Sequence, residues 1–270
     1  MKIVKILLIT ALVAVTALYA WTAVSDNMGG KDEPPVISCP EEVLEISVKD
    51  GQDALFTGMT ARDEQDGDLT GKILLSGMSK LLSDHKAKAS FVVFDSDHNL
   101  ATFTRQIRYS DYVSPRFSIQ EPLIYYRNES IALLDRIRVE DCIDGDITDT
   151  VRVGALTATS EPEVYTVDLQ VTNSMGDTVR LTLPVVLLEG IAIRPEVRLS
   201  ENLVYLEQGS SFNPKSYLAY VRTPDGIGET DEVQITGSVD TATPGTYMVH
   251  YTYPFGTTSG TSVLTVVVVE

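Results

Sequence analysis

The 270-residue chain is poor in the residues that most catalytic and metal sites use. It holds two cysteines, three histidines and one tryptophan. His85, His98 and His250 show no metal-ligand spacing. The sequence also lacks a nucleophile elbow, a phosphate-cradling glycine loop and a Cys–His arrangement. We therefore predict that the protein is not an enzyme and that it needs no cofactor, with calcium as the one cofactor left open.

Basic residues are scarce. The chain has 21 Lys and Arg against 38 Asp and Glu, a formal net charge of −17. Nucleic-acid binding is excluded as a function, because no basic face exists to displace counterions from phosphates. The same charge argues against attachment to an anionic membrane surface. An evenly acidic surface is typical of a soluble exported protein.

A long, strongly apolar and uncharged run lies at the N-terminus. Two lysines precede the run Ile6–Val24, and acidic residues follow it. Its 19 residues are close to the ~20 that cross a bilayer as a helix, and the flanking charges place the N-terminus inside the cell. We predict a signal-anchor or signal peptide over 1–25 and a polar tether over 26–35. Small residues before Asp26 leave open cleavage, and hence secretion.

The remainder of the chain repeats. Pro35, Pro115 and Pro195 recur about 80 residues apart, and the same order of apolar and turn segments follows each proline. Short proline-bearing linkers between repeats predict a series of separate domains. The predicted domains are repeat 1 over 36–112, repeat 2 over 113–192 and repeat 3 over 193–270.

Strict alternation of apolar and polar residues predicts β-strands throughout the repeats. The clearest example is 244–269, where Tyr247, Val249, Tyr251 and Tyr253 share one face. Several short strands in fewer than 80 residues can bury a core by packing two sheets face to face. The predicted fold is all-β, three tandem β-sandwiches after the N-terminal helix. Continuous second strands are predicted over 54–62, 131–139 and 217–222, and a loop over 78–89.

An acidic motif marks the first two repeats. The string D-G-D-[LI]-T occurs at 66–70 and again at 144–148, and repeat 3 lacks it. Its carboxylates are suited to calcium, but they are equally suited to Asx turns that accept backbone N–H groups. A contact with a partner is the third interpretation, and the spacing differs from that of an EF-hand. The candidate calcium ligands are Asp63, Asp66, Asp68, Asp141, Asp144 and Asp146.

The cysteines and the aromatic residues suggest no further site. Cys39 begins repeat 1 and Cys142 lies in the acidic motif of repeat 2, so we expect two free thiols. Most tyrosines alternate at strand period and are therefore predicted to be core residues. Tyr125 and Tyr126 are adjacent, so their side chains must point to opposite faces and one ring should be exposed.

The motif A-x-D-x-x-D-G-D-[IL]-T-x-x-[IV], followed by P-G-T-Y-x-V-x-Y, resembles the bacterial Ig-like repeats of surface proteins. These include the pesticidal-crystal-protein type and the related cadherin-like and hyalin repeats. The first half lies at 61–73 and 139–151, and the second at 244–251, with a weaker copy at 163–171. The resemblance implies Ig-like sandwiches that act as stalks, spacers or adhesion modules.

We therefore expect an extracytoplasmic protein, anchored in the cell membrane by one N-terminal helix or else secreted. Its expected function is that of a stalk, adhesion or protein-interaction module. Its expected partner is an extracellular protein or glycan. The alternative is a calcium- or glycan-binding module that uses the D-x-x-D-G-D turns.

Overall fold

The computed structural model describes residues 12–21, 33–82, 85–190 and 194–270. Residues 12–21 are helical, and within the described residues no helix is long and apolar enough to cross a membrane. The apolar run Ile6–Val24 extends past this helix into residues that lie outside the described ranges. From residue 36 onward the described chain consists of strands and short 3-10 turns, so the all-β prediction is confirmed.

Repeat 1 contains one three-stranded and one four-stranded sheet. The first has the order β1-β3-β4 and the second the order β2-β7-β6-β5. Their bounds are β1 Val36–Ser38, β2 Val43–Ile46, β3 Thr60–Asp63, β4 Gly67–Asp68, β5 Leu74–Met78, β6 Lys86–Phe94 and β7 Leu100–Tyr109.

Repeat 2 has the same arrangement, with sheets β8-β10-β11 and β9-β14-β13-β12. Repeat 3 has it again, with sheets β15-β17-β18 and β16-β21-β20-β19. The bounds in repeat 2 are β8 Arg116–Ile119, β9 Ile124–Tyr126, β10 Ile137–Asp141, β11 Gly145–Asp146, β12 Arg152–Ala158, β13 Val164–Thr172 and β14 Thr178–Leu188. Those in repeat 3 are β15 Glu196–Leu199, β16 Leu203–Glu207, β17 Leu218–Thr223, β18 Gly226–Gly228, β19 Gln234–Thr236, β20 Gly245–Phe255 and β21 Thr258–Val269.

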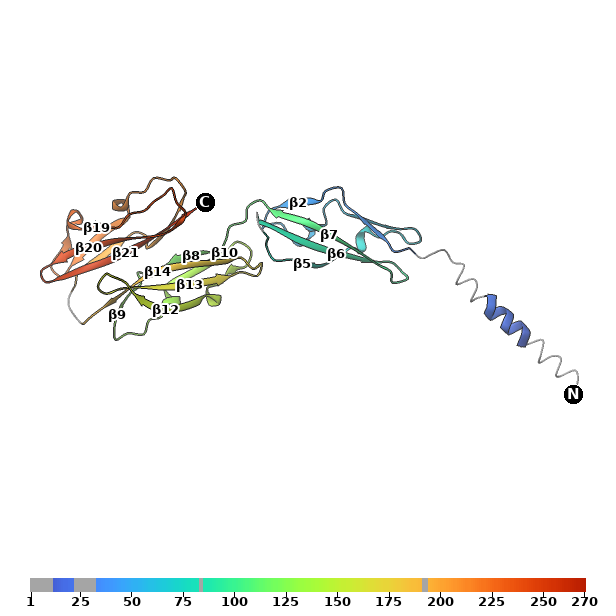
Figure 1. Cartoon of the computed structure of the whole chain (residues 1–270), viewed down its shortest axis with the longest axis horizontal. Helices are drawn as coiled ribbons and strands as arrows, with labels where there is room; N and C mark the ends of the chain where they lie inside the picture. Colours follow the sequence, from blue (N-terminus) through green and yellow to red (C-terminus); the bar gives the residue numbers. More distant parts are fainter. Residues whose placement is uncertain (1–11, 22–32, 83–84, 191–193) are drawn as a thin grey trace, which may run out of the picture. The chain divides into compact units, whose positions relative to one another are not determined.

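One unusual pairing recurs in all three repeats. The second strand of each repeat pairs in parallel with the last strand: β2 with β7, β9 with β14 and β16 with β21. The long antiparallel hairpins β6–β7, β13–β14 and β20–β21 form the centre of each larger sheet (Figure 1). Because a parallel pair needs a crossover between its strands, the recurrence shows that the three repeats share one topology.

Each repeat has its own cluster of buried apolar side chains. In repeat 1 Phe91 and Ile107 are fully buried, and in repeat 3 Tyr251 and Leu264 are. Burying one such side chain stabilises the fold by roughly 1.5–3 kcal/mol. The inward face predicted for the hairpin 244–269 is confirmed, since Val249, Tyr251 and Tyr253 are buried.

The predicted second strands are partly wrong. Each begins with a 3-10 turn, because the residues that connect the two sheets cannot continue a straight strand. The predicted loop 78–89 is also partly wrong, because β6 starts at Lys86. The 3-10 turns are η1 Gln52–Phe56, η2 Thr70–Lys72, η4 Leu133–Asp135, η5 Thr148–Thr150, η6 Pro214–Tyr217 and η7 Thr230–Glu232.

The chain divides into two compact units. The first is formed by repeat 1, and the second contains repeats 2 and 3 together with residues 47–49. Within the second unit, Leu203 of repeat 3 is buried in the apolar cluster of repeat 2. The hydroxyl of Tyr205 accepts a hydrogen bond from the N–H of Phe117 at 3.0 Å, and the guanidinium of Arg116 lies 5.1 Å from the Tyr205 ring centre. Repeats 2 and 3 therefore pack against each other, which the short-linker argument did not predict.

An ion pair joins the same two repeats beside their linker. The Arg194 guanidinium donates to both carboxylate oxygens of Glu163, at 2.7 and 2.8 Å. The side chains of Arg194 and Glu163 are only 19% and 24% exposed. Glu163 is held at φ 63°, a left-handed conformation that is costly for a residue with a side chain. Besides the ion pair with Arg194, hydrogen bonds from the N–H groups of Leu187 and Glu189, at 2.8 and 3.0 Å, hold Glu163 in this conformation.

His250 of repeat 3 is a further contact between repeats 2 and 3. The sequence places it on the outward face of a strand, as a surface side chain. In the structure its side chain is only 14% exposed, and Nδ1 lies 2.8 Å from a Glu161 carboxylate oxygen of repeat 2. The surface assignment is wrong because repeat 2 covers this part of the outer face of β20.

Candidate functional site

The acidic motif forms the β3–β4 hairpin of repeat 1 and the β10–β11 hairpin of repeat 2. Oδ1 of Asp63 accepts hydrogen bonds from the backbone N–H groups two and three residues later, both at 2.8 Å. Asp141 does the same in repeat 2, with both distances 2.9 Å. Gly67 and Gly145 have φ values of 75° and 74°, which the tight turn requires and only glycine adopts without strain. The first aspartate of each copy is therefore the acceptor of an Asx turn.

The second aspartate of the motif connects two hairpins. Asp66 accepts hydrogen bonds from the backbone N–H and the hydroxyl of Ser96, which lies in the β6–β7 turn. Asp144 accepts the same pair from Ser174 in the β13–β14 turn, both at 2.6 Å. The backbone hydrogen bond from Ser96, followed by its side-chain hydrogen bond, lowers the pKa of Asp66. In repeats 1 and 2 this carboxylate holds the smaller sheet to the central hairpin of the larger one.

The third aspartate starts the following 3-10 turn. Asp68 accepts the N–H of Thr70 at 3.0 Å, and Asp146 accepts the N–H of Thr148 at 3.0 Å together with its hydroxyl. The side-chain hydrogen bonds from these threonines are the main cause of the lowered pKa of Asp68 and of Asp146. The threonine hydroxyls in turn accept backbone N–H groups of β3 and β10.

All six sequence-predicted carboxylates are thus hydrogen-bonded to turns of their own repeat. Among the described residues no three His, Cys, Asp or Glu side chains are placed to hold a metal ion. Repeat 3 forms the corresponding β17–β18 hairpin without the D-G-D string. The hydrogen bonds agree with the Asx-turn interpretation, while calcium binding stays a prediction.

Sequence reasoning missed a buried polar network beside the second motif. The Asn173 side-chain amide donates to the Tyr112 hydroxyl at 2.9 Å and to Oδ2 of Asp141 at 3.0 Å. The Tyr112 hydroxyl donates to Asp177 at 2.7 Å. Burial, and then the hydrogen bond to Asp177, raise the pKa of Tyr112. No local sequence signal reveals the network, because its members come from a linker, a strand end and a hairpin turn.

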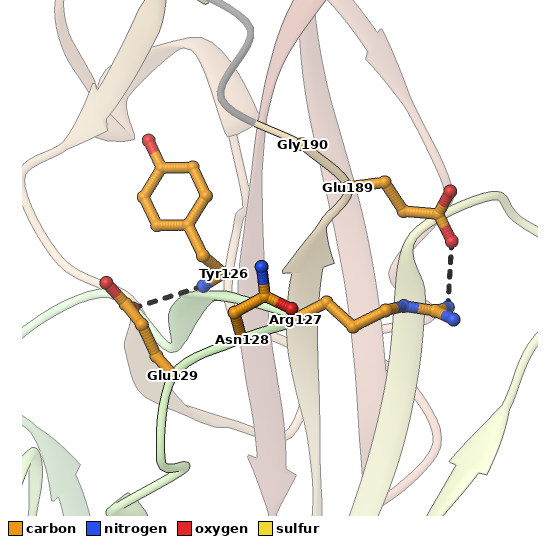
Figure 2. A pocket seen from close by; sticks show the side chains of 6 residues that line it. All are labelled: Tyr126, Arg127, Asn128, Glu129, Glu189 and Gly190. Carbon is orange, nitrogen blue, oxygen red and sulfur yellow. Dashed lines mark hydrogen bonds and ion pairs between the residues drawn. The ribbon is translucent and has the colours of Figure 1, made fainter.

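An open pocket of about 520 Å³ lies at the turn after β9. Figure 2 shows the Tyr126 ring on one side of this pocket and the Arg127–Glu189 ion pair, 2.9 Å, on the other. Glu129 accepts the N–H of Tyr126 at 3.2 Å. Tyr125 is 3% exposed and Tyr126 is 44% exposed, which confirms that one ring of the pair is free. The pocket offers a ring for stacking, but its charged groups already have partners.

The remaining sequence-predicted residues carry no chemistry of their own. Both cysteines are free thiols, as predicted. The Cys142 thiol donates to the carbonyl oxygen of Val113 at 3.1 Å, and burial is the main cause of its raised pKa. A raised pKa favours the protonated form of this exposed thiol near neutral pH.

Solved structures resemble the chain only loosely. Residues covering 54% of the chain match 26% of a structure of CBM51-2 and INT domains of ZmpB from Clostridium perfringens, with 18% identity and a TM-score of 0.24. Further matches are the extracellular domain of protocadherin GammaB4 (13% identity, 89% of this chain, 52% of that chain, TM-score 0.22) and human CDH23 EC21-23 (9%, 87%, 100%, 0.23). The chain spans 26% to 41% of the three ZmpB structures. Likenesses at these TM-scores carry no information on function.

Direct family comparison is more specific. No curated protein matches the sequence. Residues 199–266, which form most of repeat 3, match the family described as bacterial surface protein, Ig-like domain. This match confirms that the chain resembles the bacterial Ig-like surface repeats, through residues 199–266.

Proposed function

We propose that the protein is a non-enzymatic, extracytoplasmic surface protein whose tandem Ig-like repeats act as a stalk, adhesion or protein-interaction module. The family match of residues 199–266 is the observation that carries this proposal. The hydrogen bonding of the acidic motifs supports it, because their carboxylates hold turns together. Membrane attachment through residues 1–25, with the N-terminus inside the cell, completes the proposal.

Cell fractionation tests the location. The full chain is expected in the membrane fraction, and protease added to intact cells should degrade repeats 1 to 3. Sequencing the mature N-terminus separates the two forms of the proposal. A mature N-terminus at Asp26 would show secretion in place of anchoring, and protection from external protease would overturn the surface location altogether.

The interaction role has its own test. Cells that display the full chain are compared with cells that display a chain lacking 194–270, for attachment to host-cell or matrix proteins and to immobilised glycans. We expect attachment to fall when repeat 3 is removed, because repeat 3 packs on repeat 2 and contributes part of the exposed surface of the second unit. Equal attachment by both chains would leave a spacer role and exclude adhesion through repeat 3.

The alternative proposal is a calcium- or glycan-binding module that uses the D-x-x-D-G-D turns. The supporting feature is the number of carboxylates in each turn, since Ca²⁺ takes 6–8 oxygen ligands. Binding would require Asp66 and Asp144 to release the serines that they now hold. Calcium titration of the full chain, compared with its Asp66→Ala and Asp144→Ala variants, distinguishes this alternative from a spacer or adhesion role.

A further inference from the structure

A second groove, of about 570 Å³, lies on the outer face of the larger sheet of repeat 2. Its floor is a row of three cross-strand neighbours. Arg152 on β12 faces Gln170 on β13, and Gln170 faces Arg180 on β14. Because adjacent strands lie about 4.8 Å apart, the two arginines rise from positions roughly 10 Å apart on the same face. Thr246 of repeat 3 closes the groove at one side.

The row brings two arginines into one groove of an acidic molecule. The chain carries 38 acidic residues against 21 basic ones, and several of its arginines pair with a carboxylate. Arg127 and Arg194 each pair with a glutamate. Among the described residues Arg152 has no ion pair or hydrogen bond through its guanidinium, and Arg180 bonds only the Gln170 side chain, at 3.3 Å. Two guanidinium groups in one groove therefore lack an acidic partner.

The neighbouring row supplies groups of a different kind. Asp168 accepts the Thr182 hydroxyl at 2.7 Å through Oδ1, which leaves Oδ2 as a free acceptor. Gly154 on the neighbouring strand β12 lies close to Asp168, since a Cβ atom on Gly154 would be only 3.0 Å from the Asp168 carbonyl oxygen. The β-bulge between Val153 and Leu156 and the missing side chain keep this part of the groove open. Carboxylate, hydroxyl and amide groups side by side suit the hydroxyls of a sugar.

We infer that this groove binds an acidic glycan whose carboxylate groups are separated by uncharged sugars. Planar guanidinium groups bind carboxylates through two parallel hydrogen bonds, so Arg152 and Arg180 are placed for two acid groups about 10 Å apart. Gln170 orients Arg180 and can still donate its own amide. A densely charged polyanion is disfavoured, because the net charge of −17 repels it at longer range. The pocket at Tyr126 is the weaker candidate, since its arginine is already paired with Glu189.

Binding to the purified full chain tests the inference separately from the proposed surface location. The probes are a short hyaluronan oligosaccharide, in which glucuronate alternates with an uncharged sugar, a neutral malto-oligosaccharide of the same length and an oligoglutamate peptide, each titrated by calorimetry. The variants are Arg152→Ala, Arg180→Ala and the double variant. Arg138→Ala is the matched control, because Arg138 is exposed on β10, in the other sheet of the same repeat.

The expected result is binding of the hyaluronan oligosaccharide and no binding of the neutral sugar. Each single variant should weaken binding about tenfold, which corresponds to about 1.4 kcal/mol, and the double variant should abolish it. Arg138→Ala should bind like the unmodified chain, and binding should weaken as salt is added. Absence of binding at millimolar hyaluronan oligosaccharide, or an equal loss in Arg138→Ala, would overturn the site. Tighter binding of the oligoglutamate would overturn the glycan as its ligand.

Discussion

The acidic turns of repeats 1 and 2 have nearly the same sequence and the same hydrogen bonds, yet they differ in what surrounds them. In repeat 2 Asp141 is buried and receives the Asn173 amide, which also reaches Tyr112. In repeat 1 the residue that corresponds to Asn173 is Asp95. Its carboxylate cannot donate a hydrogen bond and instead accepts hydrogen bonds from the backbone N–H and the side-chain amide of Asn99. The β6–β7 turn thus has aspartate first and asparagine four residues later, whereas the β13–β14 turn has the reverse order. The motif fixes the turn, while residues far away in the sequence decide how deeply its carboxylates are buried.

The largest effect is expected from removing Asn173. Asn173→Ala leaves a carboxylate oxygen of Asp141 and the Tyr112 hydroxyl without their donor in a buried site, which should cost about 2–4 kcal/mol. Hydrogen exchange of the β10 and β13 amides reports this loss locally. The matched truncation in repeat 1, Asp95→Ala, removes the acceptor of the partly exposed Asn99 and should cost only about 1 kcal/mol. Equal losses in the two repeats would contradict the difference described above.

Glu163 tests whether repeats 2 and 3 are held together as one unit. Glu163→Ala removes both hydrogen bonds to Arg194 and leaves a partly buried guanidinium unpaired, which should cost about 2–3 kcal/mol. Glu163→Gly removes the same ion pair but relieves the left-handed backbone, so it should be about 1 kcal/mol less harmful. Unfolding in urea, followed by exchange at β14 and β21, measures both. An unchanged midpoint in Glu163→Ala would mean that this ion pair does not stabilise the unit.

The pH dependence of stability should follow the turn carboxylates. The pKa values of Asp66, Asp68 and Asp146 are lowered in the folded chain by hydrogen bonds from serine and threonine. A lowered folded pKa contributes stability that is present above the ordinary value of about 3.9 and is lost as the pH falls through the folded pKa. The melting temperature should therefore drop below about pH 4.

Substitution identifies the groups responsible for this drop. Asp66→Asn should make the low-pH decrease in melting temperature shallower, since an amide does not titrate. Asp225→Asn, in the repeat 3 turn that lacks the D-G-D string, is the control and should leave the profile unchanged. A profile that Asp66→Asn does not alter would show that Asp66 makes no contribution to acid stability.

Patterns between residues close in the sequence were enough to predict the strands and the repeats. The alternation of apolar and polar residues in 244–269 predicted the β20–β21 hairpin, and the recurring prolines predicted the three repeats. The 3-10 turns were missed because their apolar residues, such as Leu55 and Leu133, face the core as strand residues do. His250 was placed at the surface because its burial depends on the packing of two repeats, which no periodicity reports.

The pocket and the groove differ in how much of each the sequence predicts. One ring of the pair Tyr125 and Tyr126 was predicted to be exposed, because adjacent residues of a strand must face opposite ways, and the structure shows that it is Tyr126. The row of Arg152, Gln170 and Arg180 depends on the register of three strands and could not be assembled from the sequence. The six aspartates were found from their spacing. Their role as acceptors for Ser96 and Ser174 required the hairpins to be placed side by side.

Calcium titration of the full chain tests the central claim most directly, namely that the D-x-x-D-G-D turns are closed by their own hydrogen bonds. Melting temperature is measured with calcium and with a chelator, for the unmodified chain and for Asp144→Ala. We predict the same melting temperature with and without calcium, and a lower one for Asp144→Ala under both conditions, because Ser174 loses its acceptor. A calcium-dependent rise that Asp144→Ala abolishes would contradict this account and establish the turns as metal sites.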